Sequence, residues 1–216
     1  MTMTKGIMEG YTDIGAVTPE AMEISKKSRQ LISQMVGDRD LQDRIKQRCV
    51  IATGDPSLAE IIRFHNHPEQ AGLAALEEHA PIFVDIKMVE AGVLKRGHES
   101  PIQLIIGQGD DIAEKLGVTR TSAGIMALQE KLTGSIVVIG NAPSALLTLC
   151  QLIEEDKALP RMVIGVPVGF VNAAESKERL RGLPVPSITT EGTRGGTPIA
   201  VAAINEIINT YARAKI

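Results

Sequence analysis

Two arginines lie in short segments whose neighbouring residues suit the binding of an acidic group. Arg194 belongs to the glycine-rich segment 192–197, which leads into an Ala-rich helical pattern. Its guanidinium and the first amides of that helix could together hold a carboxylate or a phosphate. A tight loop that lets a helix pack closely explains the same glycines equally well. Arg120 lies among the hydroxyls of residues 119–122, a setting that fits an acidic ligand and equally a solvated arginine.

Asp85 and Lys87 follow a strongly apolar run, and both side chains could be ionised at the mouth of a site. The alternative for Asp85 is a structural role, in which its carboxylate caps or hydrogen-bonds a neighbouring loop. Segment 107–109 has the Gly-x-Gly start of a dinucleotide-binding loop without its third glycine, and no phosphate-loop lysine pattern is present. A turn that needs left-handed backbone geometry is therefore the favoured explanation of these glycines.

The histidines and cysteines form no recognisable metal or nucleophile motif. His65 and His67 are spaced i, i+2, which does not place them on one face of a helix, and His79 and His98 lie in polar segments. The two cysteines are far apart inside apolar runs, so we expect buried, reduced thiols. Neither a Ser-His-Asp order nor an HExxH spacing occurs. The sequence therefore predicts no metal site and no catalytic triad.

Short apolar runs rich in Val and Ile alternate with longer amphipathic stretches. The runs are nearly continuous, which is typical of a parallel sheet covered on both faces. We expect strands at residues 49–52, 81–86, 102–106, 135–140 and 162–166, and a weaker one at 185–189. Helical patterns cover residues 19–36, 39–48, 56–78 with a break at Pro68, 110–132, 142–156, 172–181 and 197–213.

This alternation predicts an α/β fold, a three-layer α/β/α sandwich with a mostly parallel sheet of about five strands. We expect residues 1–216 to form a single domain, with residues 1–47 as an N-terminal helical extension packed on it. Ligands of such sheets bind beyond the carboxyl ends of the strands. The segments that follow the apolar runs are therefore the candidate site.

The composition excludes several classes of protein. Of 216 residues, 44% are hydrophobic and 23% are charged, and no apolar stretch approaches the ~18 residues of a membrane span. The net charge of −3 and an aromatic content of 2% disfavour nucleic-acid binding, which needs a basic surface or stacking rings. Because residues 1–11 do not read as a secretory leader, we expect a cytoplasmic protein.

Taken together, the segments after the apolar runs are more specific than any one of them. Residues 140–146, 165–177 and 193–197 closely resemble the signature segments of the precorrin-8X methylmutase family. Residues 52–56, 85–89 and 119–121 resemble that family too, in the same order, so that the resemblance extends over about residues 20–208.

The resemblance implies an isomerase of cobalamin biosynthesis. Its members move a methyl group from C11 to C12 of precorrin-8X or cobalt-precorrin-8, which gives hydrogenobyrinic or cobyrinic acid. The resemblance also implies an α/β/α sandwich that forms a homodimer, with a corrinoid as its partner and with no cofactor or resident metal ion. Nucleic acid and membrane partners are excluded by the composition rather than by the resemblance.

A corrinoid is a wide apolar disc fringed with carboxylates, so its site needs apolar floor residues and a rim of hydrogen-bond donors. Met88, Val89, Phe170 and Val171 could supply the floor, and Lys87, Arg120 and Arg194 the charged part of the rim. The expected substrate-binding residues are Ser28, Thr53, Asp85, Lys87, Met88, Arg120, Thr121, Asn141, Ala142, Gly169, Phe170, Val171, Arg194 and Gly195.

One position departs from the family pattern. Ile51 stands where better-known members have a histidine that is regarded as the acid/base group, and an isoleucine cannot transfer a proton. Another group such as Thr53, Asp85 or a histidine could substitute, a bound water could, or the rearrangement could need mainly conformational constraint. The last alternative is a corrinoid carrier without efficient turnover. The sequence therefore assigns no catalytic residue, and a generic nucleotide-binding sandwich is a third, unrelated hypothesis.

Overall fold

The computed structural model describes Ala16 and residues 18–215. In this part of the chain six strands form one sheet in the order β1-β6-β5-β4-β2-β3. The strands are β1 (Ile62–His65), β2 (Ile82–Val84), β3 (Ile102–Leu104), β4 (Ile136–Ile139), β5 (Met162–Gly165) and β6 (Ser187–Thr190). β1 is antiparallel to β6 and every other neighbouring pair is parallel. The expected mostly parallel α/β fold is confirmed, with six strands rather than about five.

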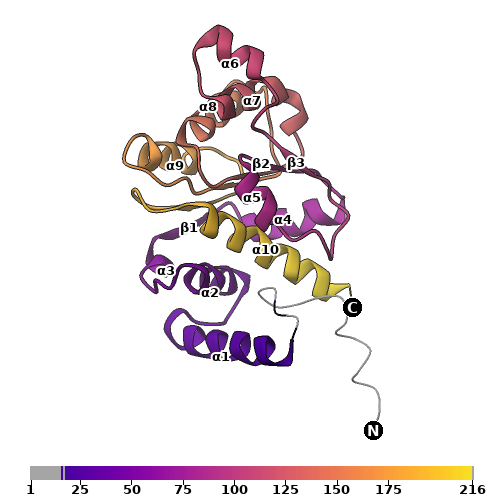
Figure 1. Ribbon diagram of the computed structural model, residues 1–216, viewed down its shortest axis with the longest axis vertical. Helices are drawn as coiled ribbons and strands as arrows, with labels where there is room; N and C mark the ends of the chain where they lie inside the picture. Colours follow the sequence, from indigo (N-terminus) through magenta and orange to yellow (C-terminus); the bar gives the residue numbers. More distant parts are fainter. Residues whose placement is uncertain (1–15, 17, 216) are drawn as a thin grey trace.

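Helices cover both faces of this sheet (Figure 1). They are α1 (Pro19–Val36), α2 (Leu41–Thr53), α3 (Leu58–Ile61), α4 (Pro68–Glu77), α5 (Lys87–Gly92), α6 (Asp110–Leu116), α7 (Arg120–Leu128), α8 (Pro143–Glu154), α9 (Ala173–Arg181) and α10 (Thr197–Ala214), with a 3-10 helix η2 (Gln129–Leu132). α2, α4, α5 and α10 pack on one face, and α7, α8 and α9 on the other. α1 packs against α2, at the end of the molecule opposite α6 (Figure 1). Over the described residues, no helix has the length and apolar character that crossing a membrane requires.

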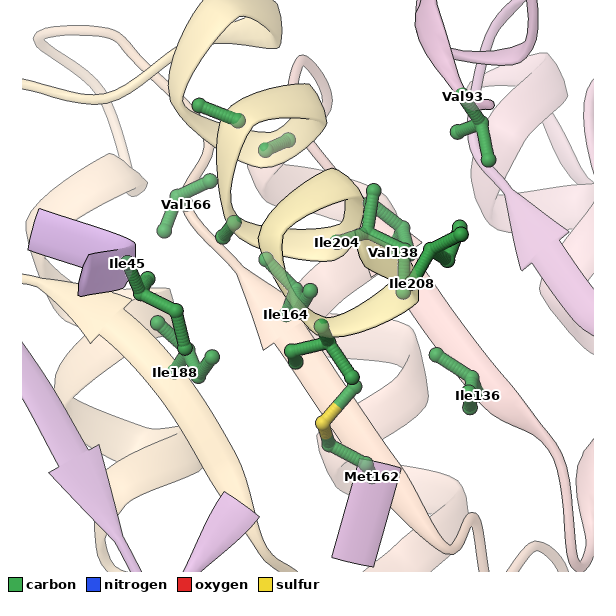
Figure 2. Close-up of a cluster of buried hydrophobic side chains, with 14 of the residues drawn as sticks. Ile45, Val93, Ile136, Val138, Met162, Ile164, Val166, Ile188, Ile204 and Ile208 are labelled. Atoms are coloured by element: carbon green, nitrogen blue, oxygen red, sulfur yellow. The ribbon is translucent and has the colours of Figure 1, made fainter. Parts of the chain in front are cut away.

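The alternation of side chains along the central strands divides the core into two clusters. Ile136 and Val138 of β4 belong to the cluster with α10, whereas Val137 and Ile139 belong to the cluster with α8. Figure 2 shows the first cluster, in which isoleucines of α10 lie over β4 and β5. Because helices bury both faces of these strands, every position is apolar and the sequence has no polar alternation.

The strand expected at residues 49–52 is wrong, because these residues form the last turns of α2. Asp40 caps the helix at its start, where its side chain accepts a hydrogen bond from Asp43 N, and Gly54 ends it in the left-handed conformation. Ile45, Cys49 and Val50 are buried against the core. Ile45 and Cys49 are four residues apart and lie on one helix face, and of the apolar run only Cys49 and Val50 are buried in the core. Residue 47, where we expected the N-terminal extension to end, lies inside α2.

The continuous helical pattern expected over residues 56–78 is also wrong. The chain forms the single turn of α3, then β1, then α4, which begins at Pro68. Asn66 and His67 both have positive φ and turn the chain between β1 and α4. β1 owes its conformation to its partner, because all four of its residues pair with β6, from Ile62 with Thr190 to His65 with Ser187, and these partners lie more than 120 residues further along the chain. A four-residue edge strand next to a proline carries too little local pattern to be recognised.

The pattern over residues 110–132 is divided into α6, α7 and η2. Gly117 ends α6 at a φ of 65° and its N–H bonds to the carbonyl of Ala113. Thr119 then caps α7, since its side chain accepts a hydrogen bond from Ser122 N. The break places Arg120 at the first position of a helix rather than in the middle of one.

Candidate functional site

The loops that follow β4, β5 and β6 lie together at the carboxyl-end edge of the parallel strands. Asn141 follows β4, Phe170 follows β5 and Arg194 follows β6, and these strands are neighbours in the sheet. Two main-chain hydrogen bonds join the last two loops: Gly196 N donates to Val166 O at 2.7 Å, and Gly169 N donates to Thr193 O at 3.1 Å. We call residues 166–172 the β5 loop and residues 191–196 the β6 loop.

Two glycines allow the loops to pack this closely. A Cβ atom at Gly195 would lie 2.3 Å from Val166 O and 2.6 Å from Pro167 O, so only glycine fits against the β5 loop. A Cβ atom at Gly140 would lie 2.9 Å from Ala200 Cβ, at the start of α10. The segment after β4 therefore also contacts the helix that follows the β6 loop.

Asp85 joins the end of β2 to the segment after β4. Its side chain is fully buried, and its Oδ2 atom accepts hydrogen bonds from Asn141 N at 2.7 Å and Ala142 N at 3.2 Å. Its Oδ1 atom accepts one from Ile86 N at 3.0 Å. Burial raises the pKa of the Asp85 carboxyl, and the main-chain N–H donors act against this rise. Of the two roles considered for Asp85, the structure shows the structural one, in which its carboxylate hydrogen-bonds a neighbouring loop.

Arg194 points toward the loop that follows α2. Its Nη1 atom donates to Asp55 Oδ2 and to Ser57 Oγ, both at 2.8 Å, and the Arg194 and Asp55 side chains are about half exposed. Hydrogen bonds from Ser57 and the nearby Arg194 guanidinium lower the pKa of the Asp55 carboxyl. Asp55 was not among the expected site residues. Its contact with Arg194 spans 139 residues, and no local pattern indicates such a pairing.

Arg120 is held in the same manner by an aspartate. Its Nε and Nη2 atoms donate to the two carboxylate oxygens of Asp110 at 2.9 and 2.7 Å, and both side chains are exposed. Thr121 beside it is buried. The Thr119 and Ser144 hydroxyls lie 2.8 Å apart and connect the start of α7 to the start of α8. Arg120 therefore lies near the segment that contains Asn141 and Ala142.

Large apolar side chains are exposed at the same edge. Phe170 has 95% of its surface exposed, Val171 has 76% and Met88, in the first turn of α5, has 66%. Lys87 next to Met88 is also exposed. Apolar groups of this size usually pack inside a protein, and a concentration of them on the surface marks a binding region.

A buried lysine beneath the β6 loop was missed in the sequence. Lys177 of α9 has 0% of its surface exposed, and its Nζ atom donates to Thr190 Oγ1 at 3.0 Å and to the main-chain oxygen of Arg194 at 2.6 Å. Burial, with the nearby Arg181 cation, lowers the pKa of Lys177 to about 8. The spacing from Ala173 and to Leu180, both buried, could have indicated it, because these positions share one helix face.

The N-terminal helices are fixed to α10 through one glutamate. Glu206 is fully buried. Its carboxylate accepts hydrogen bonds from Arg29 of α1 at 2.5 Å and from Arg48 of α2 at 3.1 Å, and it forms an ion pair with Arg44 of α2 at 2.9 Å. Ser28 precedes Arg29 on α1, which lies on the far side of α2 from the sheet (Figure 1). The structure therefore does not bring Ser28 together with the edge loops.

Thr53 and Ile51 lie on the last turns of α2, which lead to Asp55 and thus toward Arg194. The Thr53 hydroxyl donates to Cys49 O at 2.9 Å, and the Asp55 amide approaches the same hydroxyl at 3.4 Å. Ile51 is half-buried. The end of α2 is therefore connected to the carboxyl-end edge by the Asp55–Arg194 ion pair.

All four histidines of the chain lie at the other edge of the sheet. His65 pairs with Ser187, the first residue of β6, and His67 directly precedes α4. His79 comes just before β2, and its ring lies 3.6 Å from Glu99, which follows His98 in the segment before β3. Within this one chain, the four imidazoles therefore lie at the edge of the sheet opposite Asn141, Phe170 and Arg194.

Comparison with known proteins gives a consistent result. The sequence model of the precorrin-8X methylmutase family matches residues 23–210 of this chain. The cobalt-precorrin-8 methylmutase of Methanocaldococcus jannaschii is 40% identical over 211 residues, covering 93% of this chain and 98% of the relative. The precorrin-8X methylmutase of Pseudomonas aeruginosa is 37% identical over 173 residues, covering 76% and 82%. The solved structure of precorrin-8X methylmutase from Thermus thermophilus superposes with a TM-score of 0.81 at 33% identity, covering 90% of this chain and 98% of that one. The chain belongs to the precorrin-8X methylmutase family.

Proposed function

We propose that this protein isomerises precorrin-8X or cobalt-precorrin-8 by moving a methyl group from C11 to C12 of the ring, with hydrogenobyrinic or cobyrinic acid as the product. One observation carries the proposal: in a chain of this family, the exposed apolar residues Phe170 and Val171 lie on a loop bonded to the one that carries Arg194. An apolar surface beside a cation matches a flat macrocycle fringed with carboxylates.

In the proposed complex the ring rests on Phe170, Val171 and Met88, and its acid side chains meet Arg194 and Arg120. Both arginines keep donors for this purpose. The contacts of Arg194 with Asp55 and Ser57 use Nη1, and those of Arg120 with Asp110 use Nε and Nη2. A guanidinium has five N–H donors, so a substrate carboxylate can bind without breaking either ion pair.

The methyl group stays within one molecule, so the rearrangement needs no external methyl donor and no electron acceptor. The protein contributes by fixing the ring geometry, which lowers the entropic part of the barrier. Rigid loops suit this task. Asp85 joins the segments after β2 and β4, and main-chain bonds join the β5 and β6 loops. We assign no residue as the general acid.

A corrinoid carrier is the second candidate function, and a specific observation favours it. Ile51 cannot transfer a proton, and all four histidines lie at the opposite edge of the sheet. In the carrier hypothesis the same surface binds cobyrinic acid and releases it unchanged.

Anaerobic incubation with precorrin-8X and with cobalt-precorrin-8, followed by visible spectroscopy, separates these two functions. A methylmutase converts the spectrum of at least one substrate to that of its product, and unchanged spectra with both contradict the proposal. A carrier binds cobyrinic acid tightly without isomerisation, and Ile51→His then creates turnover. Arg194→Ala and Arg120→Ala each weaken corrinoid binding by about 1–3 kcal/mol, the scale of a lost charged hydrogen bond. Unaltered affinity in both variants removes these arginines from the proposed rim.

We further propose that the protein is a cytoplasmic homodimer. Ile24, Leu31 and Met35 of α1 are each more than half exposed and follow the spacing of a single helix face. A second copy of the chain that packs on this face would cover it. Sedimentation velocity of the wild type and of Leu31→Lys tests this proposal: a dimer that dissociates in the variant supports it, and a monomeric wild type contradicts it.

A further inference from the structure

We propose that Lys177 is a positioning residue of the corrinoid site, whose side chain fixes the main chain of Arg194 and thereby the shape of the β6 loop. The inference rests on the proposed function, because it assigns Arg194 to substrate binding. Lys177 itself lies beneath the loop and is fully buried, so it acts through Arg194 rather than on the ring.

The lysine nitrogen, the Thr190 hydroxyl and the Arg194 carbonyl are each hydrogen-bonded to the other two. Lys177 Nζ donates to Thr190 Oγ1 and to Arg194 O, and Thr190 Oγ1 donates to the same Arg194 oxygen at 2.6 Å. One carbonyl thus receives two side-chain hydrogen bonds, one from α9 and one from the end of β6. The carbonyl and the guanidinium belong to the same residue, so fixing the first limits the positions of the second.

The effect extends from the β6 loop to the β5 loop. Gly196 N donates to Val166 O, and Gly169 N donates to Thr193 O, so the two loops are joined on either side of Arg194. Phe170 follows Gly169 directly. A shift of the β6 loop therefore also moves the exposed apolar residues that form the proposed floor of the site.

The charge of Lys177 gives this residue a second, separable effect. Among the residues that the structure describes, no carboxylate contacts its Nζ atom: Arg181 faces it from α9, Arg194 belongs to the β6 loop and is paired with Asp55, and Cys150 of α8 contacts Ser176. A buried cation without an anionic partner is costly, and it favours the approach of a polycarboxylate. Burial sets the pKa of Lys177 at about 8. A neutral amine keeps two N–H donors, so deprotonation removes the charge while leaving both contacts possible.

Two variants separate the effect of the Lys177 hydrogen bonds on the loop from the effect of the Lys177 charge on binding. Lys177→Met removes the donors and the charge, whereas Lys177→Gln keeps two amide donors without the charge. The matched control is Lys157→Met, which removes an exposed lysine that pairs with Glu155. The measurements are spectroscopic titration with cobyrinic acid from about pH 7 to about pH 9, and hydrogen exchange of the Gly169 and Gly196 amides.

We expect Lys177→Met to weaken cobyrinic acid binding by about 10- to 100-fold, the effect of a lost hydrogen bond to a charged group. We also expect it to speed exchange at both amides. Lys177→Gln restores the slow exchange, and at neutral pH it binds as the wild type does when its lysine is neutral, more tightly than Lys177→Met. In the wild type the affinity falls as the pH rises through about 8, because a polyanion binds the protonated lysine better, and in Lys177→Gln this dependence disappears.

Tight binding and slow exchange in Lys177→Met overturn the proposal, as does a pH dependence that persists in Lys177→Gln. If Lys177→Met does not fold, Thr190→Val takes its place, because it removes the hydroxyl that donates to the same oxygen. Absence of corrinoid binding by the wild type refutes the proposed function instead. In that case the exchange of the two glycine amides still decides whether Lys177 fixes the loop.

Discussion

The replacement Glu206→Gln tests how the N-terminal helices are attached to the sheet domain. The glutamine has the same size but no charge, and its amide nitrogen is a donor that faces guanidinium donors. Glu206 is fully buried, and its partners Arg29, Arg44 and Arg48 lie at 2.5, 2.9 and 3.1 Å. Arg48 is itself buried, so its charge loses this compensating carboxylate in a place that water cannot reach.

Removing one member of a buried ion pair typically costs about 3–5 kcal/mol of unfolding free energy. For a chain of this length each kcal/mol lowers the melting temperature by about 2–4 °C, so the expected decrease is about 6–20 °C. The matched control is Glu191→Gln. Glu191 makes an ion pair with Arg63 at 2.6 Å on the surface, where both side chains are more than 40% exposed. An exposed pair contributes at most about 1 kcal/mol.

The assay is thermal and urea unfolding of the wild type and the two variants, with hydrogen exchange of α1 as a second measurement. We expect α1 to exchange faster in Glu206→Gln, because Arg29 connects α1 directly to α10. A loss below about 1 kcal/mol, equal to that of Glu191→Gln, would refute the reasoning. It would mean that packing between α1, α2 and α10 attaches the helices without help from the ion pairs.

Three further predictions concern the edge loops and the thiols. Gly195→Ala places a methyl group 2.3 Å from Val166 O. We expect urea unfolding to show a loss of about 1–3 kcal/mol in unfolding free energy, together with weaker corrinoid binding. Unchanged values would contradict the close packing. Asp85→Asn replaces a carboxylate that accepts hydrogen bonds from three main-chain N–H groups. We expect the same assay to show a loss of at least about 2 kcal/mol in unfolding free energy. An unchanged stability would contradict the role of this carboxylate in joining the two segments. Burial raises the pKa of Cys49 and Cys150 to about 12, so the thiolate fraction at pH 8 is about one in ten thousand. We therefore expect no labelling by a thiol reagent until denaturant is added. Rapid labelling of the folded protein would contradict this expectation.

Most of the fold could be predicted because the central strands carry a strong local signal. β4 and β5 are covered on both faces, so each consists almost entirely of apolar residues. α1 was predicted with its boundaries, since Thr18 before Pro19 is a clear start signal, and in the structure Thr18 caps the helix. The failures have the opposite cause. The conformation of β1 depends on a partner strand far along the chain. In the apolar run 49–52, Cys49 and Val50 are the last buried positions of a helix, not residues of a strand.

Within the candidate site, too, some features could be predicted from local sequence and others could not. The segments after the strands could be located because parallel strands present their carboxyl ends at one edge. The partners of the two arginines could not. Asp55 and Asp110 are ordinary acidic residues in sequence, and only the folded chain places them against Arg194 and Arg120. Lys177 was not expected in the site because a lysine in an amphipathic helix normally faces water.

The join between the β5 and β6 loops has a consequence for how this protein can change. Both of its hydrogen bonds connect peptide groups, which are chemically alike whatever side chains they bear. The frame is thus independent of the identity of its outward-facing residues, such as Val168, Phe170 and Val171. Random mutagenesis of these three positions should yield folded variants with altered ligand preference, which makes this edge a practical starting point for engineering receptors of other flat, acidic macrocycles.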